Sequence, residues 1–179
     1  QQLAPRFTQI QNASIDLALY RVEEPWNFSD SVKTTLVANQ KMISLTPVLQ
    51  NNNWHPPAFQ LKLTNKSQQP LWVSVLYLSD DYSITNNLLP KLLLHPGQEA
   101  WLQDNDRRGN VYRNIHVQLS KDLKEQQYHF TYEYIKLLFC SEEFDTNAFN
   151  QVGIKTNRLR ERVNKGELMP TQSIWGAQE

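Results

Sequence analysis

One run of the sequence, residues 71–78, is apolar on both of the faces that an extended chain presents. Successive side chains of a β-strand point to opposite faces, so alternate residues form two sets. The first set is Leu71, Val73, Val75 and Tyr77, and the second is Trp72, Leu76 and Leu78. A strand with two apolar faces has to be covered on both, which predicts a central strand. Asp80-Asp81 favours a turn and ends the run.

The segment before this run predicts a neighbouring strand over residues 59–64. Apolar residues alternate there with polar ones, a period of two that indicates a strand with one wet face. The apolar set is Phe59, Leu61 and Leu63, and the polar set is Gln60, Lys62 and Thr64. Residues 65–70 contain Asn, Ser and Pro, which are residue types of tight turns. Residues 59–78 are therefore expected to form two strands joined by a turn.

The rest of the chain up to residue 150 carries mostly short strand patterns. Further strands are expected at residues 15–20, 34–38, 41–49, 84–89, 92–94, 99–102, 111–119 and 134–139. Pro90 separates two of them, because proline has no donor for a ladder. Residues 51–57 are expected to form a surface loop that holds Trp54, and residues 120–127 a charged loop.

These patterns predict an all-β domain, an antiparallel β-sandwich with very little helix. The helical signal before the tail is a short turn near residues 145–150, for which Asp145 or Thr146 would be the N-cap. The expected core contains side chains from the two strongest strands and the last one. These are Trp72, Val73, Val75, Leu76, Leu137 and Phe139.

The chain of 179 residues has the size of one domain with a tail. We expect the sandwich to span residues 1–153 and a basic tail or linker to span residues 154–179. Leu159 and Val163 are four residues apart among basic side chains, a spacing that allows a weakly amphipathic helix. The chain begins at Gln1 without a methionine, so we expect it to be a piece of a longer protein.

The charge and cysteine content narrow the classes of partner. Lys and Arg together number 18, as do Asp and Glu, so the net charge is zero and no overall field attracts nucleic acid. The arginines of the tail are diluted by Glu161 and Glu167 and have no aromatic residues between them to stack bases. Cys140 is the one cysteine, which excludes an internal disulfide and fits a reducing, cytoplasmic compartment. No apolar run is long enough to cross a membrane as a helix.

An ordered series of short motifs lies between residues 58 and 150. The motifs are Asn65-Lys66-Ser67, Pro70-Leu71-Trp72-Val73, Leu88-Leu89-Pro90, Pro96-Gly97 and Ile135-Lys136-Leu137-Leu138-Phe139-Cys140-Ser141-Glu142-Glu143-Phe144-Asp145. This order resembles a bacterial domain family of undefined function that is typically attached to caspase-like cysteine peptidases and to some other multidomain signalling proteins. In that family a hairpin leaves the sheet at Asn and returns with Pro-Leu-Tyr, a later strand ends in Phe-Pro, and the last strand runs into a Phe-Asp turn. Here Trp72 stands where the family usually has Tyr, and Leu89-Pro90 where it usually has Phe-Pro.

The resemblance implies an accessory β domain of a peptidase and assigns no active residue within it. Cys140 closes an apolar run, and none of the four histidines is followed by glycine as a caspase-like motif requires. We therefore interpret Cys140 as a structural thiol, which behaves as a small hydrophobic side chain. The histidines lack the close spacing of a zinc site. Asp80-Asp81 and Asp104 with Asp106 are interpreted as solvated turns rather than calcium ligands, and we expect no metal or cofactor.

Two hypotheses from different classes follow. In the first, the chain is a non-catalytic regulatory or target-recruiting domain that contacts a caspase-like peptidase domain in cis, with Trp26, Trp54 and Trp101 as candidate interface anchors. In the second, it is a free-standing carbohydrate- or peptide-binding sandwich that uses Trp54, Trp101 or Trp175 as an aromatic platform. A reading frame with or without a peptidase domain separates the two.

Overall fold

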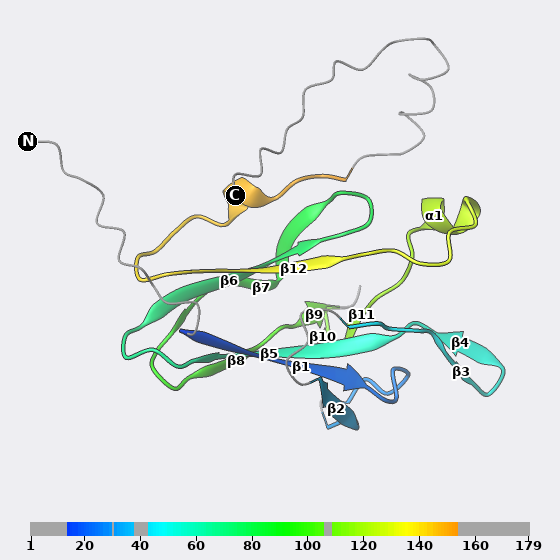
Figure 1. Cartoon of the computed structure of the whole chain (residues 1–179), viewed down its shortest axis with the longest axis horizontal. Coiled ribbons are helices and arrows are strands. Elements are labelled where there is room, and N and C mark those ends of the chain that lie inside the picture. Colours follow the sequence, from blue (N-terminus) through cyan, green and yellow to red (C-terminus); the bar gives the residue numbers. More distant parts are fainter. Residues whose placement is uncertain (1–13, 30, 38–42, 106–108, 154–179) are drawn as a thin grey trace, which may run out of the picture.

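The structure is a computed structural model that describes residues 14–29, 31–37, 43–105 and 109–153 (Figure 1). The described strands form two main antiparallel sheets and two small two-stranded ones, so the predicted all-β antiparallel sandwich is confirmed. The larger sheet contains β1 (Ile15–Val22), β2 (Thr34–Val37), β5 (Ala58–Asn65), β8 (Glu99–Trp101) and β11 (Ile115–His116). The smaller main sheet, called the β6 sheet below, contains β6 (Leu71–Leu78), β7 (Ile84–Leu94) and β12 (Tyr134–Cys140) in the order β12-β6-β7.

The remaining described elements are two small sheets and two short helices. The two-stranded sheets are β3 (Val48–Gln50) with β4 (Asn53–His55), and β9 (Asp104–Asn105) with β10 (Val111–Tyr112). The helices are α1 (Lys121–Glu125) and the short 3-10 helix η1 (Asn147–Phe149). The predicted tail, residues 154–179, and its expected helix lie outside the described residues, so the domain boundary at residue 153 stays a prediction.

The core forms where β5 of the larger sheet faces β6 of the other sheet. Buried residues from both strands make one cluster, and each fully buried Leu or Val contributes roughly 1.5–3 kcal/mol. The members from these strands are Phe59, Leu61, Leu63, Leu71, Val73 and Val75. β6 lies between β12 and β7, which confirms the predicted central strand.

The expected core residues have three different positions. Val73, Val75 and Leu76 are buried, as predicted, and Leu137 and Phe139 are half-buried against the main cluster. The prediction for Trp72 was wrong in degree, because this side chain is only half-buried. It lies on the outer face of the β6 sheet, where the Lys91 ammonium is 5.5 Å from the centre of its ring.

Asn65 ties the two sheets together at the turn between β5 and β6, two strands that belong to different sheets. Its side-chain amide is fully buried and donates to the carbonyl oxygens of Gln69 at 2.9 Å and Leu94 at 2.8 Å. Its side-chain oxygen accepts from the backbone N–H and the hydroxyl of Ser67 at 2.9 and 2.7 Å. Its backbone also bonds to Gln98 and Gly97 in the turn between β7 and β8. A buried Asn65 with these bonds is a structural residue of the turn.

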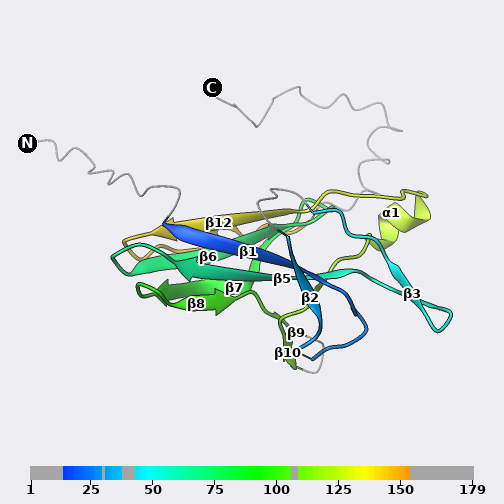
Figure 2. The same cartoon turned by 60° about the horizontal axis from the view of Figure 1, so that its bottom comes forward.

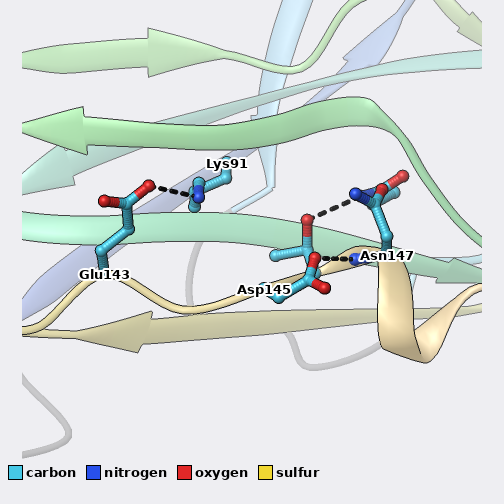
Figure 3. Close-up of polar contacts among 6 residues, drawn as sticks. Lys91, Glu143, Asp145 and Asn147 are labelled. Carbon is cyan, nitrogen blue, oxygen red and sulfur yellow. Dashed lines mark hydrogen bonds and ion pairs between the residues drawn. The ribbon is translucent and has the colours of Figure 1, made fainter.

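The segment after β12 folds back across the outer face of the β6 sheet (Figure 3). The buried Thr146 hydroxyl accepts from the side-chain amide of Asn86 in β7 at 2.8 Å, and Lys91 pairs with Glu143. Thr146 is the N-cap residue of η1 by position but makes no side-chain cap bond. The Asp145 carboxylate accepts from the N–H of Asn147 at 2.9 Å instead, as Figure 3 shows.

The structure corrects the predicted break at Pro90, because β7 continues through it from residue 84 to residue 94. β6 and β7 pair Val75 with Leu89 but Val73 with Leu92, so one extra residue of β7 lies between these pairs. A proline is tolerated at such a bulge because the local ladder is already interrupted.

Three other predictions were wrong in detail. Residues 51–57 contain a hairpin rather than a loop, because Asn51 and Asn52 both take positive φ (50° and 61°), as the tight turns of hairpins require. Residues 111–119 form β10 and β11 rather than one strand. Between them the buried Asn114 side chain bonds to Gln60. The charged stretch 120–127 contains the helix α1.

We predict that Asn65→Ala lowers the free energy of unfolding by about 2–4 kcal/mol, because it removes a buried side chain that donates to the carbonyl of Leu94 and accepts from Ser67. Urea unfolding of the full chain measures this change. Asn87→Ala is the matched control, since Asn87 is exposed in β7 and should change stability by less than about 0.5 kcal/mol. Equal effects of the two substitutions would contradict the role given to Asn65.

Candidate interaction surfaces

Trp101 lies on the outer face of the larger sheet, in β8, opposite Lys62 of β5. Its half-buried ring contacts the ring of Tyr20 with centroids 5.6 Å apart. Two cations also lie over it, the ammonium of Lys62 at 5.6 Å and the guanidinium of Arg113 at 5.0 Å. Cations are attracted to the face of an indole, so these contacts hold the ring within the domain.

Glu99 places a carboxylate beside the cations around Trp101. Its carboxylate is 2.8 Å from the Lys62 ammonium and accepts from the Thr64 hydroxyl at 3.5 Å. The hydrogen bond to Glu99 raises the pKa of Lys62, and the same bond lowers the pKa of Glu99. Both groups therefore stay charged near neutral pH. The predicted anchor Trp101 is part of an intramolecular aromatic and ionic cluster.

Trp26 and Trp54 lie near the other end of the larger sheet but do not form one surface. The ring of Trp26 packs on His55 with centroids 5.5 Å apart. Trp54 precedes His55 in β4, and successive side chains of a strand point to opposite faces. Trp54 therefore points away from Trp26, and 69% of it is exposed. The three predicted tryptophans occupy three separate places.

Buried amides fix the loop that carries Trp26. The side chain of Gln60 donates to the oxygen of Asn114 at 2.7 Å, and Asn114 donates to the carbonyl of Asn27 at 2.8 Å. In the same loop the ring of Phe28 packs on Tyr112 and His116, with centroids 5.3 and 5.1 Å apart. Sequence reasoning missed this cluster because its members come from separate loops and short strands.

A row of alternate exposed aromatic residues leads into β12 and is called the aromatic row below. Its members are Tyr128, Phe130, Tyr132 and Tyr134, which are 53%, 69%, 62% and 63% exposed. The rings of Phe130 and Tyr132 touch edge to face, with centroids 5.9 Å apart. The period of two among these residues is visible in the sequence and could have identified the row.

Glu133 lies between Tyr132 and Tyr134 in the sequence, and its side chain points toward Tyr77 of the β6 sheet. Its carboxylate accepts a hydrogen bond from the hydroxyl of Tyr77 in β6. Burial raises the pKa of Glu133, the bond from Tyr77 opposes that rise, and the charge of Asp80 adds to it. Burial also raises the pKa of the Tyr77 hydroxyl, so Tyr77 keeps its proton as donor. This bond anchors the polar side of the segment to the β6 sheet and leaves the aromatic side exposed.

Cys140, His55 and His116 lie in strands of the domain. The Cys140 sulfur is half-buried and accepts from the N–H of Glu142 at 3.4 Å. His55 belongs to β4 and His116 to β11, and neither of these strands pairs with β12, which contains Cys140. His116 bonds to the carbonyl of Pro25 at 2.8 Å. Within the described residues no three His, Cys, Asp or Glu side chains gather as metal ligands, and no described helix is long and apolar enough to cross a membrane.

The two carboxylates of the acidic turn after β6 accept hydrogen bonds from backbone N–H groups. The Asp80 carboxylate accepts from the N–H of Ser120 at 2.9 Å, and the Asp81 carboxylate accepts from the N–H of Ser83 at 2.9 Å. Asp106, the other candidate calcium ligand of the sequence analysis beside Asp104, lies outside the described residues. Asp80 therefore connects this turn to the start of the segment that leads to α1.

Comparison with known proteins adds no relative, because no family model, curated protein or solved structure matches the chain.

We predict that Glu133→Gln changes the pH dependence of stability. A carboxyl whose pKa is raised by folding contributes stability below its unfolded-state pKa, about 4.3, and loses it as the pH rises through the folded value. Glutamine lacks this titration. The free energy of unfolding of the wild type minus that of Glu133→Gln should therefore fall from about pH 4 to pH 7.

Urea unfolding at a series of pH values measures this difference. Glu142→Gln serves as the matched control, because Glu142 is exposed beyond the end of β12 whereas Glu133 is half-buried. A difference for Glu133→Gln that rises with pH would show that the bond to Tyr77, and not burial, dominates.

Proposed function

We propose that this chain is a non-catalytic accessory domain of a bacterial caspase-like cysteine peptidase, which regulates the peptidase or recruits its target in the cytoplasm. The observation that carries this proposal is the aromatic row, in which Tyr128, Phe130, Tyr132 and Tyr134 are each exposed by half or more. Exposed apolar patches on folded domains mark interaction surfaces. Tyrosine and phenylalanine are also enriched where proteins meet.

The positions of the motif residues support the resemblance on which the peptidase partner depends. Asn65 fixes the turn between β5 and β6, and Pro90 lies at the bulge of β7. The Phe-Asp motif begins the segment that folds back over the β6 sheet, where Thr146 bonds to Asn86. The motif order thus follows residues that determine the fold, as expected for motifs shared by a domain family.

A contact in cis suits the charge of the chain. The formal net charge is zero, and electrostatic attraction mainly accelerates the capture of separate, oppositely charged partners. A domain linked to its partner in one chain can instead rely on apolar contacts. Of the three predicted anchors, Trp54 is the most available, since Trp26 and Trp101 are half-buried against neighbouring side chains.

One observation favours the alternative of a free-standing carbohydrate- or peptide-binding module. Trp54 presents an indole that is 69% exposed near the turn of the hairpin between β3 and β4. Exposed aromatic rings are suitable platforms for sugar rings and for peptide side chains. Under this alternative, binding would depend on Trp54 and not on a peptidase domain.

We predict that the peptidase domain encoded in the same reading frame, expressed separately, co-elutes with this chain in gel filtration at about 0.5 M salt. An apolar contact survives at this ionic strength, where exposed charges are screened. The double variant Phe130→Ser/Tyr132→Ser should elute separately because it removes two exposed rings of the row. Leu36→Ser is the control, since Leu36 is 56% exposed on β2 and lies outside the row.

A reading frame without a caspase-like domain would exclude the contact in cis. Separate elution of the wild-type chain, together with an unchanged peptidase rate and substrate choice after deletion of this domain, would also contradict the proposal. Quenching of tryptophan fluorescence by oligosaccharides that is lost in Trp54→Ala would favour the alternative module.

A further inference from the structure

Within the described residues β12 is an edge strand, with a regular ladder on one side and no strand on the other. All of its residues from Tyr134 to Cys140 pair with β6 without a register shift. Among the described residues no strand pairs with the opposite edge of β12. Edges of this kind expose backbone donors and acceptors and can pair with another chain. In β12 a single charged residue, Lys136, interrupts an otherwise apolar run that ends in Cys140.

The other edge of the same sheet is protected. β7 carries Pro90 at its bulge, and its first residue, Ile84, forms a bridge with Gln151. The side chain of Asn150 also accepts from the N–H of Asn86 at 3.2 Å. Proline and a covering segment are ordinary ways to block an edge. The contrast identifies the β12 edge as the accessible one.

The sandwich is open on the β12 side. At the opposite side the sheets are joined, since the N–H of Gln103 bonds to the carbonyl of Leu88 at 2.8 Å. β12 and β1 lie along the same side of the molecule in Figure 2. By register Ile135 lies on the inner face of the β6 sheet opposite Tyr77, and Leu17 lies on the inner face of the larger sheet opposite Leu63. Ile135 is nevertheless 37% exposed, and Leu17 is 50% exposed.

The outer face of β12 continues the aromatic row. Tyr134, Lys136 and Leu138 alternate there, with Lys136 exposed. Lys136 forms no ion pair with another residue of the described part of the chain, while Lys62, Lys91 and Lys121 each pair with a glutamate. A residue placed opposite Lys136 on an added strand would therefore be favoured if it carried a carboxylate.

We propose that the free edge of β12 accepts an extended peptide of a partner protein as a fourth strand of the β6 sheet. The peptide places an Asp or Glu opposite Lys136 and apolar or aromatic residues opposite Tyr134 and Leu138. Its backbone completes the ladder, and its inward side chains cover Ile135 and Leu17. Addition of a strand to a sheet edge is a common mode of peptide recognition. The inference rests on the proposed function as an interaction domain and specifies the element that is bound.

A second copy of this chain fits the edge less well. In a two-fold pairing of β12 with itself, residues of equal parity face each other. The registers that pair most of the strand place Lys136 opposite Lys136, Leu138 or Cys140, so none of them gives it a carboxylate. Like charges that are opposite or diagonal across strands are unfavourable. Charge complementarity therefore favours an acidic partner peptide.

The test is selection of a phage-displayed library of random heptapeptides on the immobilised full chain, in parallel for the wild type and Lys136→Glu. The wild type should enrich Asp or Glu with aromatic or β-branched residues two positions away on both sides. Lys136→Glu should enrich Lys or Arg at the same place. The best wild-type peptide should bind Lys136→Glu about fivefold or more weakly. Lys33→Glu, an exposed lysine before β2, is the matched control and should leave affinity unchanged.

A scan of N-methylated versions of the best peptide tests the backbone part of the proposal. Only alternate amides of an added strand bond to the edge, so losses of affinity should alternate with a period of two. Absence of acidic enrichment, failure of Lys136→Glu to reverse it, or losses without alternation would overturn the proposal. Dimerisation in sedimentation equilibrium that is inhibited by the peptide would assign the edge to a second copy.

The two proposals fail separately. If the peptidase domain co-elutes with Lys136→Glu as it does with the wild type, and no acidic peptide is enriched, the accessory function stands and the β12 inference is wrong. If acidic peptides are enriched but the peptidase domain elutes separately, the edge is a peptide site and the partner is not that domain.

Discussion

The sandwich depends on the buried amide of Asn65. This side chain lies at the end of β5 in the larger sheet and donates to Leu94 at the end of β7 in the β6 sheet. It also closes the turn that leads to β6 through Gln69 and Ser67. The apolar contact between β5 and β6 is non-directional, so it favours close packing without selecting one register. The directional bonds of Asn65 select the arrangement in which the apolar faces coincide.

This arrangement leaves the two sides of the sandwich unequal. On one side the turn between β7 and β8 is bonded to Asn65 and brings the sheets together. On the other side β12 ends the β6 sheet, and inner-face residues such as Ile135 stay partly exposed. The aromatic row leads directly into this side, with Glu133 bonded inward to Tyr77. The fold thus concentrates exposed apolar surface beside a free strand edge, and this coincidence is the physical basis of the proposed interaction function.

The sequence predicted the parts of the fold in which local pattern and tertiary environment agree. The alternation over residues 59–64 and the apolar run 71–78 correspond to β5 and β6, since strands next to a core produce such patterns. The prediction that one face of β5 is wet was wrong, because Gln60 and Thr64 on that face are buried. Pro90 misled because a bulge, which depends on pairing with β6, accommodates it. The hairpin at Asn51 and Asn52 was missed because two consecutive residues with positive φ are uncommon outside glycine.

The candidate site was less predictable than the fold. The tryptophans were chosen as interface anchors by residue type, yet the neighbours that hold Trp26 and Trp101 come from distant segments. The aromatic row has a visible period, but its exposure depends on the position of β12 at an edge. Strand order is a tertiary property, so only the structure shows that, within its described residues, the outer edge of β12 has no neighbouring strand and Lys136 has no ion pair.

Hydrogen exchange of the backbone amides tests the central claim most directly, by comparing this isolated chain with the same residues inside its full-length parent protein. If the open side is an interaction surface used in cis, the amides of residues 128–140 exchange more slowly in the parent. The amides of β1 to β5 that lie away from the β12 edge should exchange at the same rate in both proteins. Equal exchange of residues 128–140 in the two proteins would show that nothing covers the aromatic row and the β12 edge, and would contradict the account.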